Sequence, residues 1–284
     1  MKRVIVSLLA LAALFSCSRK VTVIIPVNPD EVKFTASVET YTTKATDSAF
    51  EDGDKVSIAA GNPINETTVG TISGTEISIE EPIYWTKDQT ASTTFVAVYQ
   101  AGGVAEPSAN LSYDLLKGGR HDYAAHNLFM VAARTAAPRT QVNLKFKHPF
   151  AKVGFVIHNQ LDEAISKVEI KGVVMDARLD IKEEKVVLGT TTKTFEPVKL
   201  ADDSYAAVIM PQTATMSVVV TAASGTTYTF EQQAGFVYAP GTAYSTEITV
   251  DKKSSGPVAF EFTVVPWSSG GSLDYELDKD ISHE

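Results

Sequence analysis

The chain has 284 residues, with 25 basic and 34 acidic side chains, so its formal net charge is −9. This acidic balance, with no long basic cluster, excludes a typical nucleic-acid-binding protein. A single cysteine excludes an intramolecular disulfide framework and a cysteine-rich metal site. The fold must therefore be stabilised by its hydrophobic core, which a chain of this length can build.

The N-terminus has the parts of a bacterial lipoprotein signal. A basic start, Lys2-Arg3, precedes the apolar run Val4–Phe15, and Ser16 comes directly before Cys17. The run is shorter than the roughly 20 residues of a membrane-spanning helix, and its length and charge fit a secretory signal peptide. A small residue before a cysteine is what a lipoprotein signal peptidase accepts. We therefore expect a signal peptide over residues 1–16 and a lipid on the Cys17 thiol; the alternative is an ordinary signal peptide with an incidental cysteine.

The rest of the chain is rich in Thr and Val, in short alternating runs separated by Gly, Pro, Asn and Asp. β-Branched residues favour strands, and alternation places one face of a strand in a core and the other in water. Many such runs at short spacing predict an all-β fold built of sandwiches. The predicted strands are residues 32–38, 55–59, 94–99, 142–146, 152–158, 167–170, 206–210, 216–221, 226–230, 245–250 and 258–265.

Three stretches interrupt this pattern. Residues 115–125 contain a Gly-Gly break, and residues 161–165 form at most one helical turn, with a polar loop favoured. Residues 135–141 are small and polar and include Pro138, which fits an exposed, extended linker. Because the length suggests about two domains, we place an N-terminal domain at 17–140 and a C-terminal domain at 141–284.

No constellation of an enzyme stands out in the sequence. There is no nucleophile elbow, no phosphate-binding glycine loop and no H-E-x-x-H motif. His121 and His126 are interpreted as solvated loop histidines, with a metal site as the alternative. His148, beside apolar residues, is interpreted as a structural group. We therefore expect no catalysis, no cofactor and no bound metal.

Two further motifs have both a structural and a binding interpretation. The acidic run 47–54 lacks the closing glutamate of a calcium loop, so Asp52-Gly53 predicts a tight turn. Trp85 and Trp267 lie at strand edges, where we expect them to close a core; the alternative is sugar binding by exposed aromatic residues, for which Tyr84 and Tyr99 are further candidates.

Several motifs together resemble the fimbrillin-like lipoproteins of Bacteroidetes, a family that includes subunits and accessory proteins of type V pili. The resemblance covers nearly the whole chain after the leader and implies two tandem transthyretin-like (Greek-key) β-sandwich domains. It also implies a non-enzymatic fimbrial or adhesive protein at the outer membrane, held by a lipid anchor, at the cell surface or in a fimbrium. The motifs are Cys17, TKATDSAFEDGDKVSI (43–58), Tyr84-Trp85 with FVAVY after it, LKFKHPFAKVGFVI (144–157) and VVPWSSGG (264–271).

The resemblance further implies assembly by donor-strand exchange with other pilin subunits. In such a scheme a protease cuts after a basic residue and removes the first strand, and a strand of the next subunit fills the groove. The candidate cut site is Lys44, with Lys20 and Lys33 as alternatives. The candidate displaced strand carries the apolar residues Val21, Val23, Ile25 and Val27.

The candidate donor strand is C-terminal, where Leu273, Tyr275 and Leu277 alternate with charged residues. Since this segment is short and ends in charge, an anchor, tip or minor subunit is favoured over a bulk stalk subunit. Ser48 lies in a short pattern that resembles the O-glycosylation motif of Bacteroidetes. A host protein or glycan is a further possible partner, and the alternative function is a carbohydrate-binding lipoprotein of a glycan-uptake system.

Overall fold

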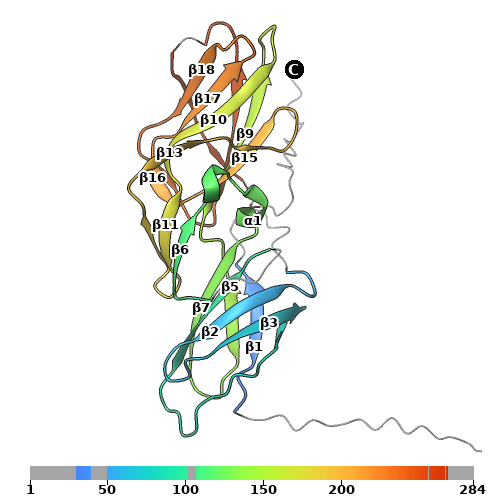
Figure 1. Cartoon of the computed structure of the whole chain (residues 1–284), viewed down its shortest axis with the longest axis vertical. Coiled ribbons are helices and arrows are strands. Elements are labelled where there is room, and N and C mark those ends of the chain that lie inside the picture. The colour runs from blue at the N-terminus through green and yellow to red at the C-terminus, as the bar shows by residue number, and fades with distance from the viewer. Residues whose placement is uncertain (1–29, 40–49, 102–106, 255, 266, 268–284) are drawn as a thin grey trace, which may run out of the picture.

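A computed structural model describes residues 30–39, 50–101, 107–254, 256–265 and 267. Strands dominate these residues, which confirms the all-β expectation. The helical elements within them are a 3₁₀ turn, η1 (Lys117–Gly119), and a short helix, α1 (Tyr123–Asn127). None of their helices is long and apolar enough to span a bilayer. The molecule is elongated, with one group of strands at the bottom of Figure 1 and another at the top.

The lower half is one seven-stranded sheet in the order β7-β5-β2-β3-β4-β1-β8. Its neighbours are antiparallel, except that β1 runs parallel to β8. The sheet curls until its two ends meet, where Val131 and Lys147 exchange two backbone hydrogen bonds of 2.9 Å. The strands are β1 (Phe34–Val38), β2 (Lys55–Ala60), β3 (Thr67–Ser73), β4 (Glu76–Ile79), β5 (Thr93–Tyr99), β7 (Met130–Ala136) and β8 (Val142–Phe146).

The upper half contains two five-stranded sheets whose buried faces share one core. The first has the order β13 (Thr192–Phe195), β10 (Ile165–Val174), β17 (Ser217–Ala222), β18 (Thr227–Gln232) and β21 (Val258–Phe260). The second has the order β14 (Val198–Lys199), β15 (Ser204–Ile209), β9 (Ala151–Asn159), β20 (Ala243–Val250) and β22 (Thr263–Val265). Two small sheets lie beside them: β12 (Lys185–Leu188), β11 (Asp176–Asp180) and β6 (Asn110–Asp114), and the pair β16 (Gln212–Ala214) and β19 (Phe236–Tyr238).

At both edges of the upper sandwich, consecutive strands belong to different sheets, so the backbone crosses from one sheet to the other. β13 of the first sheet leads through Pro197 into β14 of the second, and β21 leads through Phe262 into β22. The single strand expected over 258–265 is therefore two strands of three residues each. Short edge strands offer little unpaired backbone to other chains, which limits unwanted pairing.

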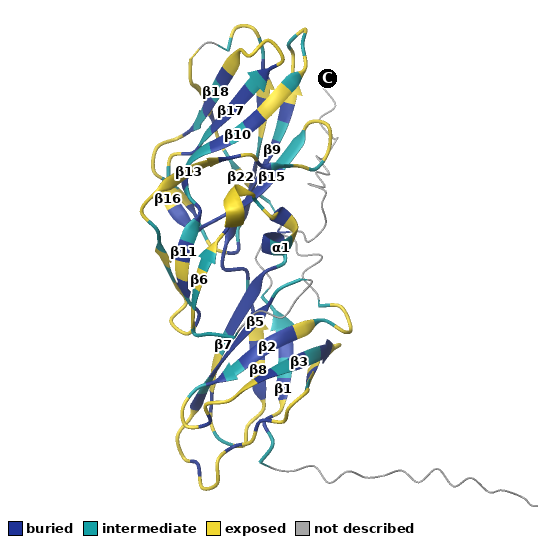
Figure 2. Cartoon of the chain, in the orientation of Figure 1, coloured by how far each residue is buried: buried dark blue, intermediate teal, exposed yellow. Residues whose placement is uncertain are grey.

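β5 and the first residues of β7, Met130–Ala132, are buried on both faces, contrary to the expectation that one face of each strand meets water. Phe95 and Ala97 of β5 point into the lower core, whereas Val96 and Val98 belong to the upper one. Figure 2 shows both strands as buried where they run between the halves. Since alternate side chains of a strand point to opposite faces, these two strands contribute apolar side chains to both cores and connect them.

The chain between β5 and β7 crosses into the upper half and returns. We call its described part, residues 107–129, the strap. The strap contains β6, which pairs antiparallel with β11 over five residue pairs, and then η1 and α1. Leu115, Leu116 and Phe129 of the strap are buried in the upper core. The Gly-Gly break expected within 115–125 lies inside η1, at Gly118 and Gly119, and α1 follows at Tyr123.

Residues 137–141 form the turn between β7 and β8, so both flanking strands belong to the lower sheet. The expected linker between domains is therefore wrong at this position, because the lower core continues to Phe146. Buried side chains of the upper half resume at Phe150. The division into an N-terminal and a C-terminal domain stays a prediction, since the strap and the shared faces of β5 and β7 link the two cores.

Other local expectations are confirmed. Asp52 and Gly53 form a turn in which Gly53 has φ +101°, a conformation that favours glycine. Residues 160–164 are a loop between β9 and β10. Trp85 and Trp267 are both buried, with 3% and 7% of their surface exposed, and close the lower and the upper core respectively.

The shared faces of β5 and β7 predict that the two halves unfold together. The single-tryptophan variants Trp85→Phe and Trp267→Phe report the upper and the lower core separately by fluorescence. We expect the urea midpoint measured by fluorescence to be the same for both variants, once the difference in their overall stability, measured by circular dichroism, is taken into account. Val98→Asp, which buries a charge between the halves, should lower both midpoints. Two separated transitions in either variant would contradict the shared core.

Candidate functional site: an N-terminal strand and a polar junction

Most site residues expected from the sequence lie outside the described part of the chain. Their positions are therefore untested by the structure, and each stays a prediction. They are Cys17, Lys44, Ser48, the segment with Val21, Val23, Ile25 and Val27, and the segment with Leu273, Tyr275 and Leu277.

The first described strand, β1, lies inside the lower sheet rather than at its edge. All five residues of β1 pair in register with β8, from Phe34↔Val142 to Val38↔Phe146. On its other side, Phe34 and Thr35 pair with Ile77 and Glu76 of β4. β1 thus fills a gap between two strands that do not pair with each other.

β1 and the residue Val32 before it contribute alternating apolar side chains to the lower core. Val32, Phe34 and Ala36 are at most 3% exposed. The Phe34 ring meets the Phe95 ring edge-on, with centroids 5.3 Å apart. Burying a Val or Phe side chain contributes about 1.5–3 kcal/mol, so β1 is a substantial part of this core.

A second notable site lies where the two halves meet. His148, between β8 and β9, stacks on the indole of Trp267 with ring centroids 4.2 Å apart, and its Nδ1 lies 3.2 Å from the Phe129 carbonyl oxygen. Only Nδ1–H can donate to a carbonyl, so this ring atom carries a proton. The Trp267 Nε1–H donates to the Asn127 carbonyl oxygen at 3.2 Å. Lys152 Nζ lies 5.7 Å from the centroids of both Tyr123 and Trp267, within the range of a cation–π contact.

Two further histidines hold the strap against the upper half. His126 Nε2 lies 3.1 Å from the Leu115 carbonyl oxygen, and its Nδ1 lies 3.2 Å from the Tyr113 hydroxyl. A neutral ring satisfies both contacts by donating at Nε2 and accepting at Nδ1. His121 Nε2 lies 2.9 Å from the carbonyl oxygen of Val208 and 3.2 Å from its nitrogen. β14 pairs with only two residues of β15, and the His121 ring contacts the backbone of β15 next to them.

Burial lowers the pH at which these side chains become protonated. It lowers the pKa of His121 and of His148 to about 4, although each ring's hydrogen bond to a backbone group acts in the opposite direction. Burial also lowers the pKa of His126, and it lowers that of Lys152 to about 8. A charged histidine is disfavoured here because the charged form loses its hydration.

The interpretation of His121 and His126 as solvated loop histidines is wrong. The strap folds against the upper half, which buries His126 and half-buries His121, and a loop sequence alone does not reveal this. His148 is confirmed as a structural group, since it is 4% exposed and hydrogen bonded. Within the described ranges, no group of three or more His, Cys, Asp or Glu side chains is placed to hold a metal ion.

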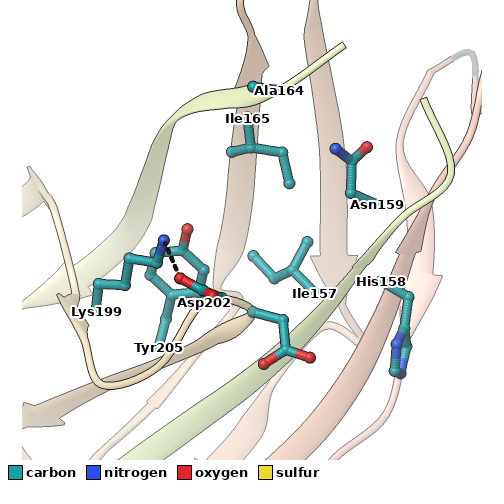
Figure 3. A pocket seen from close by; sticks show the side chains of 9 residues that line it. Ile157, His158, Asn159, Ala164, Ile165, Lys199, Asp202 and Tyr205 are labelled. Atoms are coloured by element: carbon teal, nitrogen blue, oxygen red, sulfur yellow. Dashed lines mark ion pairs between the residues drawn. The ribbon is translucent and has the colours of Figure 1, made fainter. Parts of the chain in front are cut away.

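A pocket of about 580 Å³ opens at the far end of the upper sandwich, between β9, the start of β10 and the β14–β15 turn. Figure 3 shows Ile157 and Ile165 facing each other across it and Lys199 paired with Asp202. At its rim His158 pairs with Glu247. Because these polar groups already have protein partners, the pocket offers few unmet contacts to a ligand.

Comparison with known families and structures adds to this geometry. A family described as fimbrillin-like matches residues 43–267. The chain belongs to the fimbrillin-like family. The resemblance seen in the motifs is thereby confirmed. A comparison with curated proteins found no match.

Solved structures share the fold of this fimbrillin-like chain. A candidate cell adhesion protein from Bacteroides uniformis is 18% identical, with a TM-score of 0.58 over 84% of this chain and 99% of the other. A second candidate cell adhesion protein, from Bacteroides ovatus, is 13% identical, with a TM-score of 0.59 over 83% and 95% of the two chains. At these identities the likeness shows the fold alone.

Two features of these sites were missed in the sequence. β1 was recognised as a strand but not as the segment that a cut at Lys44 would detach. Lys152 was read as part of an alternating strand, whereas it is 1% exposed at the junction. The signal for Lys152 was available: it stands in the run AKVGFVI, where the neighbouring residues are apolar on both faces.

Proposed function

We propose that this fimbrillin-like protein is a non-enzymatic cell-surface lipoprotein and a type V pilus subunit that exchanges strands at the position of β1. Membership of the family supports a fimbrial or cell-surface subunit that assembles with other pilins. The observation that carries the finer proposal is the placement of β1 between β4 and β8. Cys17 would hold the precursor at the outer membrane, and an anchor, tip or minor subunit remains the favoured role.

A cut after Lys44 would detach β1 together with everything before it. β1 ends at Val38, and the family match begins at residue 43, beside the candidate cut site. We therefore propose that β1 is displaced together with the earlier segment that contains Val21, Val23, Ile25 and Val27. Removal of β1 is what opens the groove.

Loss of β1 would leave a template for another strand. The facing edges of β4 and β8 would lose their backbone partners. The Phe95 ring would lose its contact with Phe34 and become exposed. Unpaired strand edges beside an apolar groove favour the addition of a strand from another chain. The direction of β1 sets the direction of the donor, parallel to β8 and antiparallel to β4.

The C-terminal segment has the side-chain pattern that such a groove requires. Val32, Phe34 and Ala36 fill alternate positions, and Leu273, Tyr275 and Leu277 have the same spacing of two residues. In that register the intervening Asp274, Glu276 and Asp278 would face water. Three apolar residues give a short donor, which supports an anchor, tip or minor subunit over a bulk stalk subunit.

The rival function, carbohydrate uptake through exposed aromatic residues, loses three of its four candidates because Trp85, Trp267 and Tyr99 are buried, whereas Tyr84 is 43% exposed. Lipidation of Cys17 and O-glycosylation of Ser48 belong to the proposal and are tested by intact mass. N-terminal analysis of protein from native membranes distinguishes the two fates of the anchor. A lipidated Cys17 end fits a retained anchor, and a new end at Ala45 fits a processed pilin.

Strand complementation tests the groove directly. A chain beginning at Ala45 should be less stable than the chain beginning at Ser18, because it lacks the buried residues of β1. We expect a synthetic peptide of residues 30–39 to bind this shortened chain and raise its Tm. A peptide of residues 271–280 should compete for the same groove.

The matched control is the 30–39 peptide with Phe34→Asp, which keeps the length and adds a charge at the buried position. It should neither bind nor raise the Tm. Equal stability of the two chains, or equal binding of both peptides, would rule out β1 as the exchanged strand.

A further inference from the structure

A hollow of about 980 Å³ opens beside the strap. Residues of β6, η1 and α1 form most of its wall, and Gln100 after β5 and Val198 of β14 complete it. The lower sheet, the strap and the upper sandwich thus all contribute to one concave surface. A volume of this order is typical of sites for small organic ligands.

The aromatic part of this wall is held in a fixed arrangement. The half-buried rings of Tyr113 and His121 line the hollow, and the buried His126 ring lies 5.5 Å from each of them, measured between centroids. The hydrogen bonds of His126 to Tyr113 and Leu115, and of His121 to Val208, restrain the rings. A rigid aromatic surface loses little conformational entropy when a ligand packs on it.

The polar part of the wall has side chains that are not hydrogen bonded to any of the described residues. Gln100, Ser112, Lys117 and Arg120 line the hollow, and the described residues offer their side chains no hydrogen bond or ion pair. This differs from the pocket of Figure 3, where Lys199 pairs with Asp202.

Two carboxylates at the rim are oriented by the backbone. Asp114 accepts a hydrogen bond from the Leu116 nitrogen at 2.8 Å, and Asp122 accepts one from the Ala125 nitrogen at 3.2 Å. Each of these bonds uses one carboxylate oxygen, so the second oxygen can accept from a ligand hydroxyl. The hollow thus combines oriented acceptors with the amide of Gln100 and two cations.

We propose that this hollow binds a saccharide that carries a carboxylate. The aromatic wall suits the C–H face of a sugar ring, and the carboxylate oxygens and the amide suit its hydroxyls. Arg120, with Lys117 beside it in the chain, suits a carboxylate, because guanidinium groups bind carboxylates through two parallel hydrogen bonds. The site is independent of strand exchange, since no residue of β1, β4 or β8 lines it.

Isothermal titration of the chain beginning at Ser18 tests the site with three probes: glucuronate, glucose and acetate. Glucuronate should bind at least about tenfold more tightly than either of the others, because only it offers both the ring and the charge. Arg120→Gln should weaken glucuronate binding about tenfold and leave glucose binding unchanged. Ala124→Trp, which fills the hollow from an exposed position on α1, should abolish binding without lowering the Tm.

The matched control is Arg134→Gln, on an exposed arginine of β7 that does not line the hollow. It should bind glucuronate like the unmodified chain. Acetate binding as tight as glucuronate would reduce the site to a simple anion site and overturn the proposal. No binding of glucuronate, or equal losses in the Arg120 and Arg134 variants, would also overturn it. Strand complementation by the 30–39 peptide remains a separate readout, so failure here leaves the proposed pilus role distinguishable.

Discussion

Lowering the pH from 7 to 5 is expected to reduce the free energy of unfolding by about 4 kcal/mol through His121 and His148 together. His148 is buried at the junction of the halves and His121 is half-buried between the strap and β15, and loss of hydration lowers the pKa of each to about 4. The unfolded chain takes up these protons near pH 6.5, so the folded state binds fewer protons throughout the interval between the two values.

The sign of the effect follows from this difference. Stability contributed by the neutral rings is complete above pH 6.5, falls as the pH drops through the window from 6.5 to 4, and changes no further below it. Lys152 has the same sign in another window, between its usual pKa near 10.5 and about 8, so it adds no slope between pH 5 and 7. Each histidine contributes about 2 kcal/mol at pH 5.

Urea unfolding at pH 5, 6 and 7 measures the effect. His148→Gln keeps a donor for the Phe129 carbonyl and removes the titrating ring, so its loss of stability between pH 7 and 5 should be smaller by about 2 kcal/mol. The unmodified chain, measured at the same three pH values, is the reference. Parallel profiles for the His148 variant would show that its ring is not kept neutral by burial.

Trp267→Ala is expected to reduce the free energy of unfolding by about 3–5 kcal/mol, the usual cost of removing a buried large aromatic side chain. The indole is 7% exposed, stacks on His148 and donates to the Asn127 carbonyl. Its removal leaves a cavity beside Lys152 and one carbonyl without its donor. Urea unfolding at pH 7 followed by circular dichroism measures the loss.

Trp267→Phe separates packing from hydrogen bonding. Phe keeps a six-membered ring against His148 but loses the N–H and the five-membered part of the indole, so its cost should be smaller than that of Ala, at about 1–2 kcal/mol. A loss of less than 1 kcal/mol in Trp267→Ala would contradict a packed role for the indole at the junction. In that case the segment from β22 onward would contribute little to the union of the two halves.

The strands were foreseeable because their cause is local. Thr- and Val-rich alternation at residues 55–59, 142–146 and 245–250 specifies a pleated segment with one apolar face, and β2, β8 and β20 cover these positions. The turn at Asp52-Gly53 was foreseeable for the same reason, since only its own backbone conformation selects glycine. The break between β21 and β22 was not, because Phe262 turns between sheets to pack against neighbouring aromatic rings distant in sequence.

The candidate sites depended on contacts that no local pattern contains. His121 lies in a polar loop sequence and becomes half-buried only because the strap crosses to β15 of the upper half. Val96 and Val98 alternate with Phe95 and Ala97 in one apolar run, and two different cores are needed to bury both sets. The turn at 137–141 has the composition of a linker, yet the pairing of β1 with β8 keeps the chain in the lower sheet.

The sequence by itself determined the all-β class, most strands, the burial of both tryptophans and the resemblance to the fimbrillin-like family. These follow from side-chain periodicity, turn residues and motif order, which act over a few neighbouring residues. Only the tertiary structure decided that β1 fills a gap between β4 and β8, that β5 and β7 serve two cores, and that the strap half-buries His121. Such contacts join residues tens of positions apart, and burial, which sets both their stability and their pKa values, exists only once those residues meet.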